Sequence, residues 1–223
     1  MGTTQMFSAL VANETYFEES IAAFVALGPV LNLTHSGSEL IRFIAEHEST
    51  LNLVFSLLGV YEIFPEDWWL SEEWSEICSL LPPLCSLALE LVSDEKPWLN
   101  SLERTPVYMG HYPSGTSLKS MVHYAQIMNA ARFQRYDYGS MLNKYIYHRD
   151  KAPLIDVQKI HSVPIAMFVG QYDLLADPED NQITAPQLET LAHYGEYELG
   201  HLGFFLSRKM EYFRDDVVSF LDQ

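Results

Sequence analysis

The stretch Val163-Pro-Ile-Ala-Met-Phe-Val-Gly170 runs directly into Gln171-Tyr-Asp-Leu-Leu-Ala-Asp-Pro178. Its first part is a nearly continuous apolar run that ends at a glycine, a pattern typical of a strand buried on both faces of a parallel sheet. Its second part is a loop that places Asp173 three residues after the strand. In open α/β sheets, reacting groups lie just beyond the carboxyl ends of the strands. The stretch therefore predicts a parallel sheet and a candidate catalytic acid.

Segments on both sides of this stretch extend the prediction. Ala22–Leu27 is a second apolar strand, which ends at Gly28-Pro29, and Tyr194–Leu199 is a short third strand. Apolar spacing and turn residues predict helices at residues 3–11, 16–21, 115–129, 140–147, 187–192 and 207–221. Strands that alternate with helices indicate an α/β fold, with a mostly parallel sheet and covering helices.

Residues 31–105 have a different pattern. Apolar residues recur there at helical spacing, and Gly59, Pro65, Pro82-Pro83 and Pro97 separate the runs, which predicts an α-helical subdomain. All four tryptophans fall in this region, at positions 68, 69, 74 and 98. The block Phe64–Trp74 mixes aromatic and acidic residues, and packing between helices with a solvated face is favoured over a lipid-touching surface.

Charge and composition exclude several classes of protein. The chain has 223 residues, 13 Lys and Arg against 30 Asp and Glu, and a net charge of −17. Phosphate binding needs clustered Lys and Arg, and we expect no such cluster, so nucleic acid and anionic membrane surfaces are not expected partners. No apolar run reaches the length of a membrane span, and no integral membrane segment is expected.

The two cysteines and the histidines give no metal site by their spacing, and neither a metal nor a cofactor is expected. Cys78 and Cys85 leave two alternatives open. They either close a small disulfide-bridged loop or lie as two buried thiols at i and i+7 on one helix face.

Asp173 and His201 form the candidate catalytic pair. Each follows a predicted strand, and they lie 28 residues apart in the order acid then histidine. That is the order of the last two members of the Ser-Asp-His triad of α/β hydrolases, in which the acid orients the imidazole and the imidazole transfers protons. A histidine in a glycine-flanked loop is more often structural, so the pair alone does not decide the function.

The chain begins Met1-Gly2-Thr3-Thr4, which is the sequence that follows the serine in a Gly-His-Ser-x-Gly-Thr-Thr nucleophile elbow. This motif resembles the acid lipase family, which includes gastric and lysosomal lipases. The resemblance extends in order along the chain, weakening at residues 31–105, through Phe24–Val30, Ser114–Gln126, Phe133–Gly139, Asn143–Tyr145, Val169–Asp180 and Glu198–Phe205.

The resemblance assigns the triad acid to Asp173 and the triad histidine to His201. It implies that the nucleophilic serine falls immediately before Met1, so that Met1 and Gly2 belong to the elbow and Met1 supplies the first oxyanion donor. The chain is then the later part of a longer hydrolase, and the strand at residues 22–27 has an unpaired edge. One departure is Gly203, which stands where the family usually has Asp.

Other polar residues receive structural interpretations. Ser36 and Ser114 each precede a glycine but lack a glycine two residues earlier, and Thr3 and Thr4 lie inside the elbow helix, so none is expected to act as the nucleophile. His123 is expected to pack in the core. Asp177 and Asp180 are expected to cap the next helix.

For the whole chain, the resemblance implies a truncated α/β-hydrolase fold with an inserted helical cap or lid. The expected divisions are residues 1–30 for the elbow helix and core strand, 31–105 for the cap, and 106–223 for the rest of the core. The implied activity is hydrolysis of neutral lipid esters (triacylglycerol or sterol esters), with contact to a lipid interface through the cap. Lacking the serine, the chain as given is expected to be inactive.

The alternative is a non-catalytic lipid-binding or interaction remnant of the same fold. The family resemblance implies a secreted or lysosomal protein. The sequons at Asn13 and Asn32 give that location weak support.

Overall fold

The computed structural model describes residues 1–63, 76–111 and 115–222 of the chain. The aromatic and acidic block Phe64–Trp74 and the rejected candidate Ser114 lie outside these residues.

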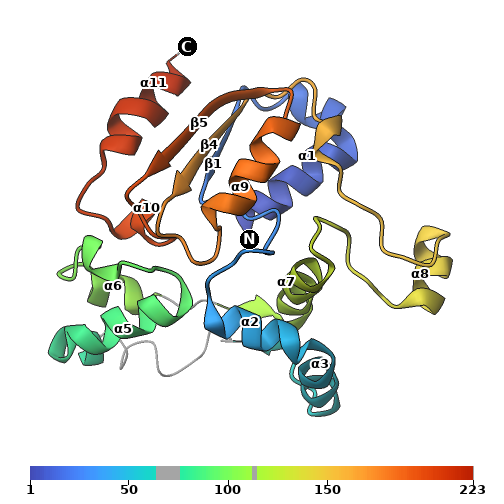
Figure 1. Cartoon of the computed structure of the whole chain (residues 1–223), viewed down its shortest axis with the longest axis horizontal. Helices are drawn as coiled ribbons and strands as arrows, with labels where there is room; N and C mark the ends of the chain where they lie inside the picture. The colour runs from blue at the N-terminus through green and yellow to red at the C-terminus, as the bar shows by residue number, and fades with distance from the viewer. Residues whose placement is uncertain (64–75, 112–114, 223) are drawn as a thin grey trace.

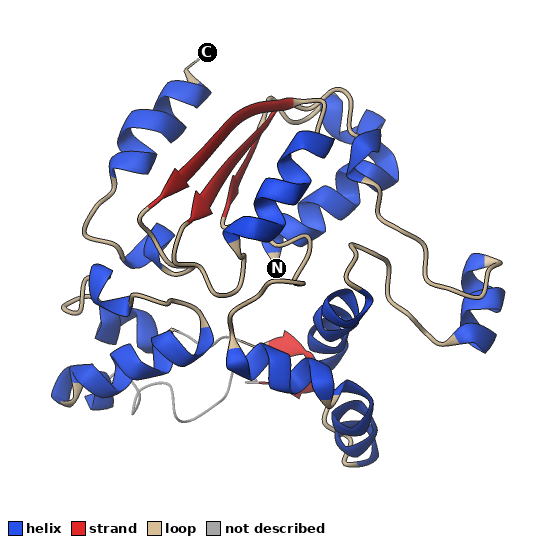
Figure 2. Cartoon of the chain, in the orientation of Figure 1, coloured by secondary structure: helices blue, strands red, loops and turns tan. Residues whose placement is uncertain are grey.

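A parallel three-stranded sheet forms the centre of the fold, in the order β1-β4-β5. Its strands are β1 (Phe24–Leu27), β4 (Ile165–Gly170) and β5 (Leu191–Tyr197). All six residues of β4 are buried, as the apolar run at this position predicts. Among the described residues, β1 pairs only with β4, so its other edge has no strand beside it. The sheet and its covering helices (Figures 1 and 2) confirm the predicted α/β fold class.

Alternate residues of β4 face two separate hydrophobic cores. Ile165 and Met167 pack with the helix α1 (Gly2–Glu18) on one face of the sheet. Ala166 and Phe168 pack on the other face with the C-terminal segment, through Tyr212 among others. This two-sided burial is possible because side chains alternate between the faces of a strand.

Helix α1 begins at Gly2, at the start of the predicted elbow helix, and continues as far as Glu18. Its backbone leaves helical geometry at Asn13, which separates the two helices predicted at residues 3–11 and 16–21. Thr4 donates a hydrogen bond to the Val30 carbonyl at 2.6 Å, and Thr3 accepts one from the Val30 amide at 3.1 Å. The two threonines therefore anchor the start of α1 to the chain that follows β1.

The chain between β1 and β4 is mostly helical and lies largely beyond the carboxyl ends of the strands (Figure 1). Ser38 caps the first of these helices and accepts from the Ile41 amide. A short antiparallel strand pair, β2 (Glu62–Ile63) and β3 (Thr116–Ser117), joins the chain after the second of these helices to the start of a later one at residue 118. The helices of this region include α2 (Glu39–Glu46), α3 (Glu48–Leu57), α5 (Pro82–Val92), α6 (Thr105–Met109), α7 (Leu118–Ala130) and α8 (Ser140–Tyr147).

A disulfide bond joins Cys78 to Cys85 and links the helical residues 76–80 to α5. Of the two alternatives that the spacing left open, the structure has the bridged loop. Pro82 and Pro83 lie between the cysteines and form the first turn of α5.

Three predicted helices have different bounds in the structure. The helix predicted at residues 187–192 is wrong, because α9 (Pro178–Thr184) ends before this range and residues from Leu191 onward form β5, which pairs with β4. Residues 116–117 pair with β2 before α7 begins, which shortens the helix predicted at 115–129.

The helix predicted from residue 207 also begins later. Ser207 is extended and bridges to Asn100, and after the short helix α10 (Gly203–Leu206) the last helix starts at residue 211. It contains a π-helical part, Tyr212–Val217, and ends as α11 (Val218–Leu221).

Candidate functional site

The structure brings Asp173 and His201 together at the carboxyl ends of two adjacent strands. The loop after β4 carries Asp173 and the loop after β5 carries His201. The Nδ1 atom of His201 lies 2.8 Å from Oδ2 of Asp173. A carboxylate only accepts hydrogen bonds, so Nδ1 carries the proton, and Nε2 of the neutral imidazole keeps its lone pair.

Backbone hydrogen bonds fix the orientation of the Asp173 carboxylate. Its Oδ1 atom accepts from the amides of Leu175 and Ala176, at 2.8 and 2.7 Å, which leaves Oδ2 for the histidine. The amide of Tyr172 donates to the carbonyl of Leu199 at 2.9 Å. This bond joins the loop after β4, which carries Asp173 and is called the acid loop below, to the start of the loop after β5, which carries His201 and is called the histidine loop. Both loops are held by the sheet rather than by the side-chain pair alone.

The surroundings of His201 favour its protonated form. Burial alone would lower the pKa of His201, but the charge and hydrogen bond of Asp173 outweigh burial, with a further contribution from the charge of Asp94, and the pKa is raised. The Asp173 side chain is fully buried, whereas 26% of the His201 side chain is exposed. The imidazole can therefore still meet a molecule from outside.

Met1, Gly2 and Gly28 lie at the same end of the sheet. Figure 1 shows the N-terminus near the carboxyl ends of the strands, and the positive charge of the Met1 amino group lowers the pKa of His201. Burial lowers the pKa of the Met1 amino group itself. A Cβ atom on Gly28 would lie 3.2 Å from both Asp173 Oδ2 and His201 Nδ1, so Gly28 packs directly against the pair.

Asp94 is a polar residue of this site that the sequence pattern did not identify. It is fully buried, and its carboxylate accepts from Asn100 Nδ2 at 2.6 Å and from the Leu202 amide at 3.0 Å. Burial raises the pKa of Asp94, against the lowering effect of these two hydrogen bonds. The only sequence signal was an Asp next to Glu at the end of an apolar helix, which is common on protein surfaces.

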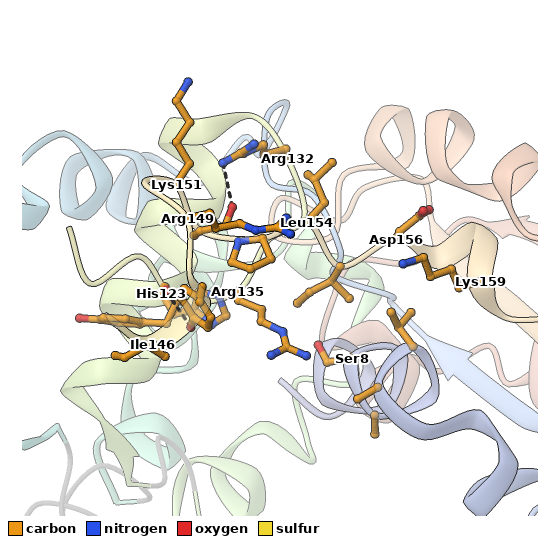
Figure 3. A pocket seen from close by; sticks show the side chains of 18 of the residues that line it. Ser8, His123, Arg132, Arg135, Ile146, Arg149, Lys151, Leu154, Asp156 and Lys159 are labelled. Carbon is orange, nitrogen blue, oxygen red and sulfur yellow. Dashed lines mark hydrogen bonds between the residues drawn. The ribbon is translucent and has the colours of Figure 1, made fainter. Parts of the chain in front are cut away.

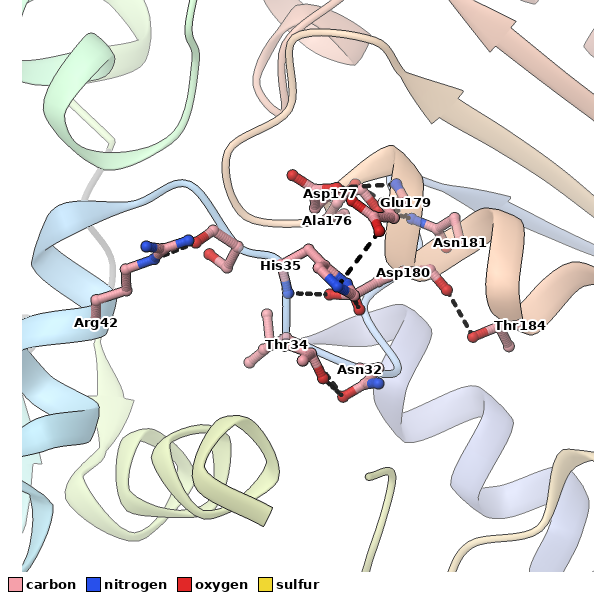
Figure 4. A network of polar contacts seen from close by, with 12 residues as sticks. Asn32, Thr34, His35, Arg42, Ala176, Asp177, Glu179, Asp180, Asn181 and Thr184 are labelled. Atoms are coloured by element: carbon pink, nitrogen blue, oxygen red, sulfur yellow. Dashed lines mark hydrogen bonds and ion pairs between the residues drawn. The ribbon is translucent and has the colours of Figure 1, made fainter. Parts of the chain in front are cut away.

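Asp177 and Asp180 have different roles in the acid loop. Asp177 accepts from the Glu179 amide and caps α9, as predicted. The capping role predicted for Asp180 is wrong, because its carboxylate accepts from the backbone and from Nδ1 of His35, at 3.0 and 2.8 Å (Figure 4). Asp180 lies on the buried side of α9, where it faces the segment that leaves β1 rather than its own helix end.

The remaining candidates lie away from the pair or are engaged in structural bonds. Ser36 is fully buried and donates to the Leu174 carbonyl at 2.6 Å, in agreement with its rejection as a nucleophile. His123 is half-buried, and its Nε2 atom lies 2.8 Å from the Gln134 carbonyl. It lines a cavity rather than packing fully in the core.

This cavity, of about 1360 Å³, lies between α1 and residues 132–159. Figure 3 shows the Arg135 side chain pointing across it toward Ser8. The expectation that the chain has no cationic cluster is wrong here, because the chain fold gathers residues that are spread over this part of the sequence. The basic residues that line the cavity are Arg132, Arg135, Arg149, Lys151 and Lys159.

Among the described residues, no group of three or more His, Cys, Asp or Glu side chains is arranged to hold a metal ion. No helix in the described part of the chain is long and apolar enough to cross a membrane.

The parallel sheet, its covering helices and an acid–histidine pair beyond consecutive strands resemble the arrangement found in α/β hydrolases. Comparison with known proteins finds lipases among the proteins that the chain is similar to. Human gastric triacylglycerol lipase is 32% identical over 230 aligned residues, which cover 100% of this chain and 56% of the relative. The mouse gastric enzyme is 32% identical over 91% of the chain and 51% of its own length. Human lipase member K is 28% identical over 97% of the chain and 55% of its own length.

These matches confirm the resemblance to gastric-type lipases over most of the chain. The chain spans about half the length of the curated relatives that it matches. No protein-family profile matches it. Among solved structures, an α/β hydrolase fold protein from Nakamurella multipartita aligns with 96% of this chain and 64% of its own, with a TM-score of 0.48 and 14% identity.

Proposed function

We propose that this chain carries the acid and the histidine of a serine lipase that hydrolyses neutral lipid esters. Asp173 orients His201, and His201 acts first as general base and then as general acid. The nucleophilic serine is expected immediately before Met1. It would attack the ester carbonyl to form an acyl-enzyme, which water activated by His201 then hydrolyses.

The 2.8 Å contact between His201 Nδ1 and Asp173 Oδ2 is the observation that carries this proposal. The position of the N-terminus supports it, because Figure 1 places it at the end of the sheet where the carboxyl ends of the strands lie. In the complete elbow, the Met1 amide would be the first donor of the oxyanion hole, where backbone amides stabilise the developing negative charge, and Gly2 would be the second elbow glycine.

The division of the chain into a core (residues 1–30 and 106–223) and a cap (residues 31–105) is part of the proposal. The cap region exposes many large apolar side chains, which supports contact with a lipid interface. The names of the relatives supply the substrate class, since two of them are triacylglycerol lipases. The exposed apolar residues of this region include Leu40, Phe43, Leu53, Val54, Leu57, Leu58, Leu80, Leu81, Leu84, Leu87, Leu91 and Trp98.

A secreted or lysosomal location is also proposed. The disulfide between Cys78 and Cys85 supports it, because disulfides persist in oxidising compartments. Asn13 of the first sequon is exposed, as glycosylation requires.

One observation favours the second candidate function, a non-catalytic lipid-binding remnant. The hydroxyls next to the expected elbow are engaged elsewhere, since Thr3 and Thr4 bond to Val30. Neither of these two hydroxyls is therefore in place to replace the serine.

The test compares the 223-residue chain with a longer chain that includes the upstream coding sequence. An in-frame Gly-His-Ser before Met1 is expected. The longer chain should hydrolyse a short-chain nitrophenyl ester and lose activity by about 10³-fold or more in Asp173→Asn and His201→Ala variants. His123→Gln serves as the matched control, because His123 bonds to Gln134 away from the pair, and it should retain activity.

Two results would contradict the proposal. Full activity of the longer chain in the His201→Ala variant would remove His201 from the mechanism. Hydrolysis by the 223-residue chain that disappears in its own His201→Ala variant would show that the chain needs no upstream serine. An in-frame stop codon directly before Met1 would favour the non-catalytic remnant.

A further inference from the structure

Asp94 lies where three separate segments of the chain meet. Its own segment leaves the end of α5, and its backbone forms an isolated antiparallel bridge with Asp173. Two backbone hydrogen bonds flank the bridge, from Leu174 N to the Ser93 carbonyl at 3.0 Å and from Glu95 N to the Tyr172 carbonyl at 2.9 Å. The main chain around Asp94 is therefore hydrogen-bonded to the loop that carries Asp173.

The Asp94 side chain reaches the histidine loop instead. Its Oδ1 atom accepts from the Leu202 amide at 3.0 Å, one residue after His201. A Cβ atom on Gly200, one residue before His201, would come within 2.4 Å of the Asp94 carboxyl carbon. The loop can approach the carboxylate this closely only because position 200 is glycine.

Asn100 completes the arrangement from the other side of the carboxylate. Its Nδ2 atom donates to Asp94 Oδ2 at 2.6 Å, while its Oδ1 atom is buried and has no partner among the described residues. A Cβ atom on Gly203 would lie 3.5 Å from that Oδ1. Gly203 stands where the acid lipase pattern usually has Asp, and the carboxylate at this corner of the site is that of Asp94.

We propose that Asp94 is a positioning residue for His201. Its main chain holds the Asp173 loop and its carboxylate holds the His201 loop, so one buried residue, together with the hydrogen bond from Tyr172 to Leu199, sets the distance between the acid and the imidazole. Its negative charge also adds to that of Asp173 in stabilising the imidazolium. The charged groups that act on His201 are Asp173, Asp94 and the Met1 amino group. This role in catalysis rests on the proposed lipase function, whereas the effect of Asp94 on His201 does not.

The test measures the His201 titration by NMR in the 223-residue chain, with the resonance assigned by comparison with His201→Gln. Asp94→Asn removes the charge and keeps the shape. The new carbonyl still accepts from Leu202, and the new amide can donate to Asn100 Oδ1 after a flip of the Asn100 amide. The pKa of His201 should fall in this variant, by less than it falls in Asp173→Asn. Asp177→Asn, a control in the same acid loop, should leave it unchanged.

The second measurement follows hydrogen exchange at the Leu202 amide. Asp94→Ala removes the acceptor, and exchange should quicken by about tenfold, as expected for the loss of one buried hydrogen bond. In Asp94→Asn the amide should stay protected. If Asp94→Ala does not fold, the His201 titration in Asp94→Asn alone tests the proposal.

A His201 titration in Asp94→Asn that matches the parent would overturn the proposal, as would a Leu202 amide that stays protected in Asp94→Ala. Failure of the proposed lipase function gives a different result. In that case the longer chain keeps its activity in the His201→Ala variant, whatever the titration of His201 shows.

Discussion

Gly28 directly follows β1 and packs against the acid–histidine pair. Its φ is +53°. This left-handed conformation costs an L-residue about 1–2 kcal/mol. A Cβ atom would in addition press on the carboxylate of Asp173 and on the imidazole of His201. We expect Gly28→Ala to lower the free energy of unfolding by more than the backbone cost alone, about 2–3 kcal/mol in urea titrations.

Gly59 provides a matched control for this substitution. Its φ is +71°, and a Cβ atom there would meet nothing within 4 Å. Gly59→Ala should therefore show only the backbone cost and leave the NMR signal of His201 unchanged. Equal losses in the two variants would mean that Gly28 does not pack tightly against the pair.

At the scale of elements, a histidine–carboxylate contact joins the segment after β1 to helix α9. The hydrogen bond to Asp180 raises the pKa of His35 above its ordinary value of 6.5, and the charges of Asp180, Glu179 and Asp177 raise it further, against the lowering effect of burial. A histidine whose pKa is raised in the folded state stabilises the fold fully below its unfolded pKa. That contribution disappears as the pH rises through the raised pKa.

We therefore expect His35→Gln to lower the free energy of unfolding more at about pH 5.5 than at about pH 9. Thermal or urea unfolding of both chains at the two pH values measures the difference. His161→Gln is the control, because His161 forms an exposed pair with Glu189, and such pairs contribute little to stability. A loss in His35→Gln that is the same at both pH values would exclude the His35 charge as its cause.

At the scale of the whole molecule, the buried strand β4 joins the two hydrophobic cores and should open only on global unfolding. Helix α8 is the opposite case, since Met141 and Tyr145 on it are 85% and 82% exposed. Hydrogen exchange followed by mass spectrometry should find the slowest amides in β4 and much faster exchange in α8. Comparable exchange in the two elements would mean that the sheet is not the most stable part of the fold.

Short-range patterns predicted much of the core. The apolar run of β4, the glycine that ends it and the Asp–Pro start of α9 are local signals, because each depends on the conformational preferences of neighbouring residues. Asp173 and His201 could be found for the same reason, since each closely follows a strand of the parallel sheet. The helix predicted at residues 187–192 failed because pairing with β4 outweighed local propensity and made Leu191–Tyr197 a strand.

The sequence by itself determined the α/β class, the candidate acid and histidine, and the resemblance to acid lipases. Only the tertiary structure decided which distant side chains join them. Asp94 meets the Leu202 amide across 108 residues, and His35 meets Asp180 across 145 residues. The cationic residues around the cavity and the bond between Cys78 and Cys85 were likewise settled by the fold. Local patterns specify each segment's own conformation, whereas these contacts depend on how the segments pack against one another.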